Sequence, residues 1–202
     1  MTENKIWTGE RLETFIYNDT TTEHLHRYAM AIEFIKNKVV LDIASGEGYG
    51  SNLLSQYAEK VIGVDIDETS ITNARLKYNR KNLEFKTGRT DEIPLQDVTI
   101  DVVVSFETLE HHDKHQEMMR EIKRVLKPGG ILIMSTPDKK YYSDESQYKN
   151  PFHVKELYLN EFKELINSHF NCSEFYFQNM FKGSLIIPEK INNGFKNFGG
   201  DF

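Results

Sequence analysis

The amino-acid sequence predicts a three-layer α/β sandwich, with helices on both faces of a mostly parallel, seven-stranded sheet. Apolar runs alternate with segments whose apolar residues recur at helical spacing, and the first two runs each end in acidic residues. Glycine-rich turns follow the first strand and precede the fifth. The strands are expected at 39–42, 60–67, 82–86, 101–106, 131–137, 173–177 and 184–187, with the last two forming an antiparallel hairpin at the edge of the sheet.

The composition of the 202 residues indicates a single domain, large enough for one substantial core. Lys and Arg number 25 against 31 Asp and Glu, with no basic cluster, so no nucleic-acid partner is expected. The single cysteine, Cys172, cannot form an internal disulfide, which fits a reducing compartment. The N-terminus is polar and no long apolar run follows, so we expect a cytoplasmic monomer or homodimer without a membrane anchor.

The helices are expected from apolar residues that recur every three or four positions. The first spans 22–36 with Thr22 as its N-cap, and the second spans 51–57. Asp67 or Thr69 is expected to cap the third. The fourth carries Met118, Met119, Ile122, Val125 and Leu126 on its buried face, has solvated His112 and His115 near its start, and is stopped by Lys127-Pro128-Gly129-Gly130. The fifth carries Tyr158, Phe162, Leu165 and Ile166.

The single domain divides into four segments along the chain. Residues 1–37 are expected to form an N-terminal flap and helix, and residues 38–137 the core of the sheet. Residues 138–153 are polar and rich in tyrosine, and they follow a strand at the carboxyl edge of the sheet, where substrate contacts usually lie. We expect them to form a lid over a substrate, followed by the last helix and the edge strands in 154–187.

The strongest motif spans residues 39–50, where an apolar strand ends at Asp42 and passes into a turn with Gly46, Gly48 and Gly50. Residues without Cβ atoms let a ligand lie against the backbone, and the following helix start offers unpaired N–H groups. A phosphate cradle and a glycine-rich turn without a ligand are two interpretations. Asp42 favours a third interpretation, a loop that binds a ligand with a cationic amino-acid group, because a carboxylate can pair with such a group but would repel a pyrophosphate.

Residues 40–50, Val-Leu-Asp-Ile-Ala-Ser-Gly-Glu-Gly-Tyr-Gly, closely resemble motif I of class I methyltransferases that use S-adenosylmethionine (SAM). The run Arg-Val-Leu-Lys-Pro-Gly-Gly at 124–130 is similar to the same family. The resemblance covers about residues 38–187 and implies a Rossmann-like fold, SAM as cofactor and 38–137 as the SAM-binding core. It assigns cofactor contacts to Asp42, Ala44, Ser45, Gly46 and Gly48.

Further cofactor contacts are expected at the ends of later strands. Asp65 lies 23 residues beyond Asp42, and in nucleotide-binding α/β folds an acid there bonds the ribose hydroxyls, with helix capping as the alternative. Arg27 is a candidate partner for the SAM carboxylate or an exposed helix residue. The resemblance adds Ile66 and Phe106 to this set.

Residues 88–95 resemble the loop that contacts adenine in this family, but Arg89 stands where the family often has Asp. Thr90 and Asp91 are the candidates in this loop. The adenine amino group is therefore read by Asp91, by the backbone, or by neither.

Glu107, Glu110 and His111 form a Glu-x-x-Glu-His sequence directly after the fourth strand. Two carboxylates and one imidazole could hold a divalent cation such as Mg²⁺, and the pattern resembles the metal site of ubiquinone-pathway O-methyltransferases. Such an ion would acidify a substrate hydroxyl. In the alternative, Glu107 contacts the substrate, Glu110 caps a helix and His111 acts alone as a base. His153 is a second candidate base, or a packed loop histidine.

These features together predict a SAM-dependent methyltransferase that acts on a hydroxyl of a small molecule. Three further motifs, Thr-Gly-Glu-Arg, Glu-His-Leu-His-Arg-Tyr and Asn-Pro-Phe-His-Val, resemble methyltransferases encoded near glycosyltransferases, which implies a sugar or sugar-nucleotide acceptor in glycan biosynthesis. The alternatives are O- or C-methylation of a quinone-like ring and a SAM-binding module without catalysis. A nicotinamide dehydrogenase is disfavoured by Asp42 and by the missing GxGxxG geometry.

Overall fold

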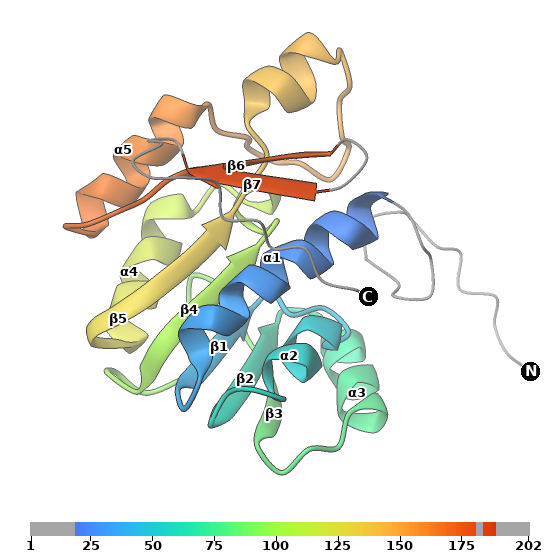
Figure 1. The fold of residues 1–202 in the computed structure, drawn as a ribbon, viewed down its shortest axis with the longest axis vertical. Coiled ribbons are helices and arrows are strands. Elements are labelled where there is room, and N and C mark those ends of the chain that lie inside the picture. Colours follow the sequence, from blue (N-terminus) through green and yellow to red (C-terminus); the bar gives the residue numbers. More distant parts are fainter. Residues whose placement is uncertain (1–18, 181–183, 189–202) are drawn as a thin grey trace, which may run out of the picture.

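The computed structural model describes residues 19–180 and 184–188, so the expected N-terminal flap and the terminal residues lie outside the described part of the chain. Figure 1 shows a central sheet with helices on both faces and two further strands above α1. Five parallel strands form the sheet in the order β3-β2-β1-β4-β5. Their bounds are Val39–Ile43 (β1), Lys60–Asp65 (β2), Leu83–Thr87 (β3), Ile100–Phe106 (β4) and Leu126–Ser135 (β5).

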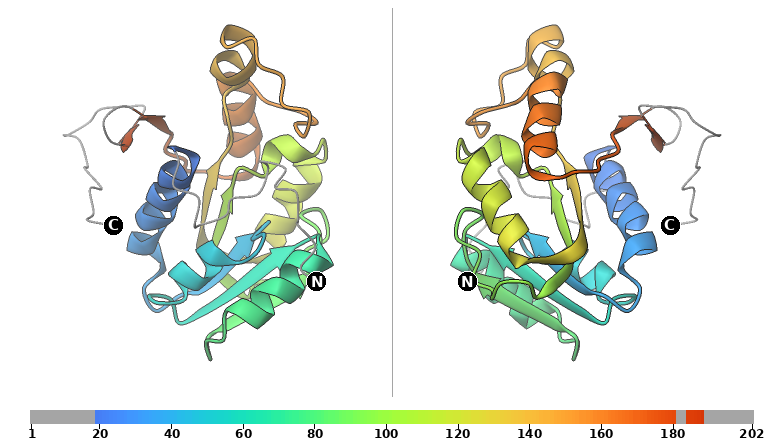
Figure 2. Two further views of the ribbon diagram at one scale, coloured as in Figure 1. Left: turned by 90° about the vertical axis from the view of Figure 1, so that its right-hand side faces the viewer. Right: turned by 90° about the vertical axis from the view of Figure 1, so that its left-hand side faces the viewer.

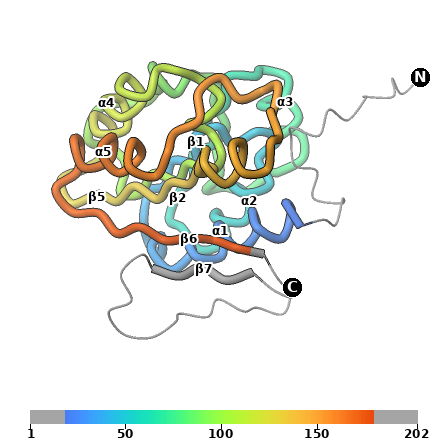
Figure 3. Tube along the Cα trace, turned by 90° about the horizontal axis from the view of Figure 1, so that it is seen from above, coloured from blue at the N-terminus to red at the C-terminus, as the bar shows by residue number. Residues whose placement is uncertain are grey.

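The helices divide between the two faces of the sheet, as the view from above shows (Figure 3). The described helices are α1 (Asp19–Ile35), α2 (Tyr49–Leu54), α3 (Glu68–Lys77), α4 (His115–Val125) and α5 (Leu159–His169). One core cluster joins α1 and α2 to the sheet, a second joins α4 and α5 to it, and a third, smaller cluster joins α3 to β3. The predicted three-layer α/β architecture is therefore confirmed.

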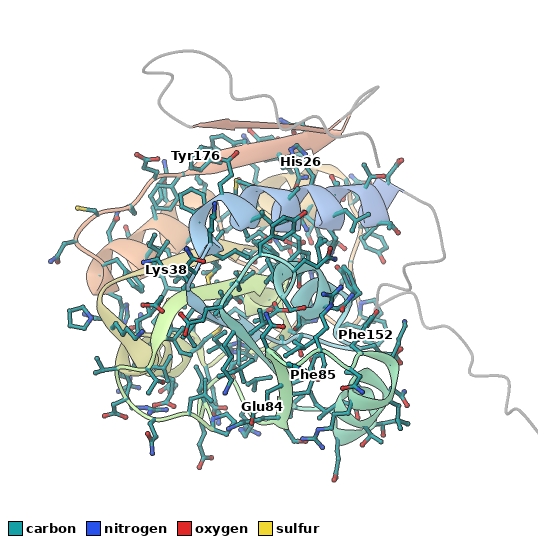
Figure 4. All side chains as sticks on the ribbon, turned by 60° about the horizontal axis from the view of Figure 1, so that its bottom comes forward. His26, Lys38, Glu84, Phe85, Phe152 and Tyr176 are labelled. Atoms are coloured by element: carbon teal, nitrogen blue, oxygen red, sulfur yellow. The ribbon has the colours of Figure 1, made fainter. Side chains whose placement is uncertain are left out.

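The predicted seven-stranded sheet with an antiparallel edge hairpin is wrong. The last two strands, β6 (Tyr176–Met180) and β7 (Ser184–Pro188), pair only with each other, as a separate antiparallel unit in the described chain. This hairpin lies against α1, where the Arg27 side chain donates to Gln178 on β6 at 2.7 Å. Figure 4 labels His26 on α1 and Tyr176 at the start of β6. The polar contact to α1 replaces the expected contact with the sheet edge.

Several element boundaries also differ from the expected ones. α1 begins at Asp19 rather than after Thr22, whereas Asp67 caps α3 as predicted by accepting from the Thr69 N–H at 3.1 Å. The run Lys127–Gly130 does follow the end of α4, but it lies inside β5 as an irregularity. Ile100 pairs with Leu126 and Val102 with Ile131, so β5 accommodates three extra residues there.

The core confirms the apolar pattern of the fourth helix, because the side chains of Met118, Met119, Ile122 and Val125 are completely buried. His115, expected to be solvated, is only 4% exposed. Its Nε2 lies 2.9 Å from the Leu109 carbonyl and 2.7 Å from the His112 carbonyl, so it closes the turn before α4. No helix of the described chain is long and apolar enough to cross a bilayer.

Residues 138–153, which we call the lid after their predicted role, rise above the carboxyl edge of the sheet in both side views (Figure 2). The segment after β5 contains a π-helical turn, η2 (Lys140–Glu145), and then runs back toward the 3₁₀ turn η1 (Leu109–His111). Backbone N–H groups of Val154 and Lys155 both donate to the Glu110 carbonyl, at 2.8 and 3.1 Å. These bonds attach the end of the lid to the end of β4.

Gly50 is required by the close approach of α2 to α1. A Cβ atom there would lie 2.0 Å from Cζ of Tyr28, a buried side chain. We therefore expect Gly50→Ala to lower the free energy of unfolding by about 1–3 kcal/mol, the usual cost of overpacking. Urea denaturation measures this, with a double-mutant cycle as control: in a Tyr28→Ala background the same change should cost much less. An equal cost in both backgrounds would contradict the proposed clash.

Candidate functional site

The glycine-rich loop between β1 and α2 is held in a left-handed backbone conformation. Ala44, Gly46 and Gly48 have φ angles of 61°, 53° and 81°. A Cβ atom on Gly46 would meet no atom within 4 Å, so this part of the loop presents bare backbone. A Cβ on Gly48 would lie 2.5 Å from the Phe85 ring, which explains the second glycine by packing rather than by ligand contact.

Asp42 is buried at the end of β1, with 1% of its surface exposed. One oxygen accepts the Ser51 hydroxyl at 2.6 Å and the other accepts the Tyr28 hydroxyl at 3.2 Å. Burial raises the pKa of Asp42 to about 7, although both hydrogen bonds oppose the rise. The carboxylate thus joins β1 to α1 and α2. Its predicted contact with a cationic ligand stays a prediction.

Asp65 joins the glycine-rich loop to the start of α3. Its two carboxylate oxygens accept the backbone N–H of Gly46 at 2.8 Å and that of Asp67 at 2.9 Å. Because each carboxylate oxygen has two lone pairs, both retain capacity for a further donor. The neighbouring Ile66 is 64% exposed and extends beyond the strand end. This arrangement is compatible with a ribose contact by Asp65 and an apolar contact by Ile66.

Ser45 gives a direct test of whether the loop fits a ligand. Its hydroxyl is buried and has no hydrogen-bond partner among the residues that the structure describes. A buried hydroxyl without a partner loses free energy unless a ligand or water bonds it. The residues at the ends of β1 and β2 therefore fit a polar ligand such as SAM.

In the expected adenine loop, the Asp91 carboxylate is paired with two cationic side chains. Arg89 forms two hydrogen bonds to Asp91, at 2.8 and 3.1 Å, and Lys114 lies 2.6 Å from the same carboxylate. These cations hold the pKa of Asp91 well below its usual range. Thr90 lies 3.4 Å from Nε2 of His112. Arg89 therefore binds Asp91, one of the candidates for contact with adenine.

Glu107 lies just past β4 and has a strained φ of 49°. The Glu107 carboxylate accepts the Ser135 hydroxyl at 2.6 Å. Nη1 of Arg27 lies 3.4 Å from the same carboxylate, close enough for an ion pair. This nitrogen has no hydrogen bond to any group in the described part of the chain. The preceding Phe106 is buried edge-on against Tyr28. Glu107 is thus directed toward α1, with Arg27 between it and β6.

Glu110 points the other way, into the protein beneath the lid. Its side chain is 1% exposed and accepts the Thr136 hydroxyl at 2.9 Å. Burial, with a smaller contribution from the negative charge of Glu107, raises the pKa of Glu110. A buried carboxyl group with a raised pKa can donate a proton or bind a cation.

His111 and His153 meet edge-on, with ring centroids 5.2 Å apart. His153 comes from the lid, where it stacks on Tyr142 at 5.0 Å and lies 2.5 Å from the Glu156 carboxylate through Nδ1. Both His153 and Glu156 are less than 10% exposed as side chains. His111, which is 32% exposed as a side chain, faces the lid backbone.

The expected ligand set of Glu107, Glu110 and His111 is therefore not the one that the fold brings together. The described residues place ligand atoms of Glu110, His111 and His153 within 4.8 Å of one another, and Glu107 is engaged by Arg27 and Ser135 instead. The sequence analysis also missed Glu156 and Tyr28. The i, i+3 spacing of His153 and Glu156 was a signal that could have found one of them.

A hollow of about 370 Å³ lies elsewhere, near the start of β5 and the end of α5, where Lys123, Gly129 and His169 are among its lining residues. This is the amino edge of the sheet. The glycine-rich loop, Asp65 and the histidines all lie at the carboxyl edge, where ligands of open α/β sheets bind. We therefore place the candidate site at the carboxyl edge.

Comparison with known proteins agrees with this geometry. Residues 41–134 match the family model described as Methyltransferase domain. Over part of its length the chain is thus similar to SAM-dependent methyltransferases. A probable SAM-dependent methyltransferase of Mycolicibacterium smegmatis is 38% identical over 130 residues, 64% of this chain and 50% of that protein. One from Mycobacterium tuberculosis is 39% identical over 128 residues, 63% of this chain and 46% of that protein. The chain thus spans about half the length of these curated relatives.

Solved structures confirm the Rossmann-like methyltransferase fold. The YcgJ protein of Bacillus subtilis superposes with a TM-score of 0.66 at 22% identity, over 78% of this chain and 71% of that one. The [4+2]-cyclase SpnF superposes with a TM-score of 0.65 at 18% identity, over 83% and 63% of the two chains. Because that protein is named a cyclase, the fold alone does not decide the reaction.

The raised pKa of Asp42 predicts a pH-dependent stability. Its ordinary pKa is 3.8 and the folded value is about 7, so the folded protein holds a proton that the unfolded chain releases in this window. The free energy of unfolding should fall as pH rises from about 4 to about 7, then level off. Asp42→Asn removes this titration, so the advantage of the variant over the wild type should grow across the window by up to about 4 kcal/mol, at about 1.4 kcal/mol for each pKa unit.

Urea denaturation at several pH values measures this difference. Asp97→Asn is the control, since the Asp97 side chain is 70% exposed. A difference between Asp42→Asn and the wild type that stays constant with pH would contradict the burial of a titrating carboxyl group.

Proposed function

We propose that this chain transfers the methyl group of SAM to a hydroxyl of a small molecule. The observation that carries the proposal is the unpartnered buried Ser45 hydroxyl in a loop of exposed backbone, one strand away from Asp65. The methyltransferase-domain match over 41–134 covers both residues. Asp65 would bond the ribose, the backbone near Gly46 would lie against the amino-acid part of SAM, and Asp42 would hold the loop.

In this reaction the protein itself needs to supply little covalent chemistry. The acceptor oxygen attacks the methyl carbon, the carbon–sulfur bond breaks with its electron pair on sulfur, and S-adenosylhomocysteine leaves. The acceptor proton must pass to a base. His111 follows β4, His153 comes from the lid, and their rings are in contact. The rings of His112 and His115 are also in contact, but His115 is buried and bonds the turn before α4. His111 and His153 belong to the proposed proton-handling site.

For the acceptor we propose a sugar or sugar nucleotide. Tyr141, Tyr148 and Phe152 of the lid are 59%, 53% and 39% exposed. Exposed aromatic rings, two of which carry a hydroxyl group, suit a ligand that has both apolar faces and hydroxyl groups. A methyl-acceptor screen on the purified chain, read by S-adenosylhomocysteine release, tests this choice; turnover of quinone-like rings but of no sugar would contradict it.

Calorimetry tests the cofactor directly. We expect SAM and S-adenosylhomocysteine to bind, and Asp65→Ala to weaken binding by about 1.5–3 kcal/mol, as for hydrogen bonds to a charged group. Asp97→Ala is the matched control on an exposed acid. Binding of NAD without SAM would overturn the proposal, and an unchanged affinity of Asp65→Ala would remove Asp65 from the ribose role.

A further inference from the structure

We propose that Glu110, His111 and His153 form a binding site for a divalent transition-metal ion of the zinc class, which joins the lid to the end of β4. The inference deepens the proposed function, on which its catalytic meaning rests. The three residues come from two segments: Glu110 and His111 from η1, and His153 from the lid. His111 and His153 are 42 positions apart in the sequence. Their ligand atoms lie within 4.8 Å of one another.

The orientation of the two imidazole rings carries the inference. Nδ1 of His111 lies 3.2 Å from the Phe152 carbonyl oxygen, and Nδ1 of His153 lies 2.5 Å from a Glu156 carboxylate oxygen. Since these oxygens only accept, both Nδ1 atoms carry the proton and both Nε2 atoms carry the lone pair. Histidines that bind metals nearly always donate their other ring N–H to a carbonyl or carboxylate in this way.

The carboxylate is held in the same manner. Oε2 of Glu110 accepts the Thr136 hydroxyl at 2.9 Å, which leaves Oε1 facing Nε2 of His111 at 3.9 Å. Glu156, which orients His153, is itself bonded by the Ser143 hydroxyl at 2.5 Å. Each of the three donor groups therefore has an outer partner that fixes it, the arrangement that supports metal ligands in proteins.

The distances require a small adjustment. Around an ion with bonds of about 2.1 Å, neighbouring donor atoms lie about 3.0–3.4 Å apart. The ligand atoms of the three residues lie within 4.8 Å of one another, with Nε2 of His111 3.9 Å from Oε1 of Glu110, so the side chains must move closer together to bind an ion. Nδ2 of Asn150 lies 3.1 Å from Nε2 of His153 and would give way to the ion.

The donor set selects the class of ion. Mg²⁺ prefers six oxygen donors, whereas two imidazole nitrogens and one carboxylate suit Zn²⁺ and its neighbours in the first transition row. The exchange of Glu107 for His153 therefore also changes the expected ion from Mg²⁺. Three protein ligands leave a position for a substrate oxygen, which a bound ion would acidify.

Metal binding is tested with Co²⁺, whose visible absorption reports its ligands, and with Zn²⁺ by calorimetry on the purified, metal-stripped chain. We expect one ion per chain. Glu110→Gln and His153→Ala should each weaken binding at least tenfold, and Glu156→Gln should weaken it about 10- to 100-fold without removing a ligand. His169→Ala, a histidine at the end of α5, is the matched control and should bind as the wild type does.

Binding of S-adenosylhomocysteine and circular dichroism are measured on the same variants, so that loss of the fold is not mistaken for loss of a ligand. Absence of Co²⁺ and Zn²⁺ binding by the folded wild type would overturn the metal site, as would His153→Ala that binds as tightly as the wild type. If S-adenosylhomocysteine still binds in that case, the metal site fails alone. If metal binds and S-adenosylhomocysteine does not, the proposed function fails and the metal site stands.

Discussion

The buried Asp42 carboxylate is the constraint on which the carboxyl edge of the sheet depends. It accepts hydroxyls from Tyr28 on α1 and Ser51 on α2, so one side chain at the end of β1 fixes two helices. Tyr28 in turn packs edge-on against Tyr49 and Phe106, with ring centroids 5.5 and 5.0 Å away. The shape of the glycine-rich loop is thus a consequence of packing on one face of the sheet. Burying a carboxylate costs free energy unless hydrogen-bond donors such as these hydroxyls offset the loss of hydration.

The other acidic residues at the carboxyl edge of the sheet form two groups, one after β2 and one after β4. On one side, Asp65 holds the Gly46 and Asp67 N–H groups and so sets the distance between two loops. On the other, Glu107 and Glu110 leave the end of β4 in different directions, one toward Arg27 and the other toward Thr136 under the lid. In the proposed function the first group would contact the cofactor and the second the acceptor, so that the two molecules would meet above β4.

The sequence predicted the parts of this arrangement that are local. The strand–loop–helix unit around Asp42, the cap at Asp67 and the buried methionines of α4 each follow from a few neighbouring residues. The position of the β6–β7 hairpin does not, because it depends on the contact between Gln178 and Arg27, 151 positions apart. The same holds for the metal-like cluster: Glu-x-x-Glu-His is a local pattern, but the folded chain replaces its first member with a lid histidine.

The most direct test of the account is the map of amide chemical-shift changes that S-adenosylhomocysteine causes in the isotope-labelled chain. The account predicts the largest changes in residues 44–48 and 65–67, with smaller ones at Phe106 and none around Gly129 and His169 at the amino edge of the sheet. Changes centred on Gly129 and His169, or saturation with NAD instead, would contradict a SAM site built on the Asp42 anchor.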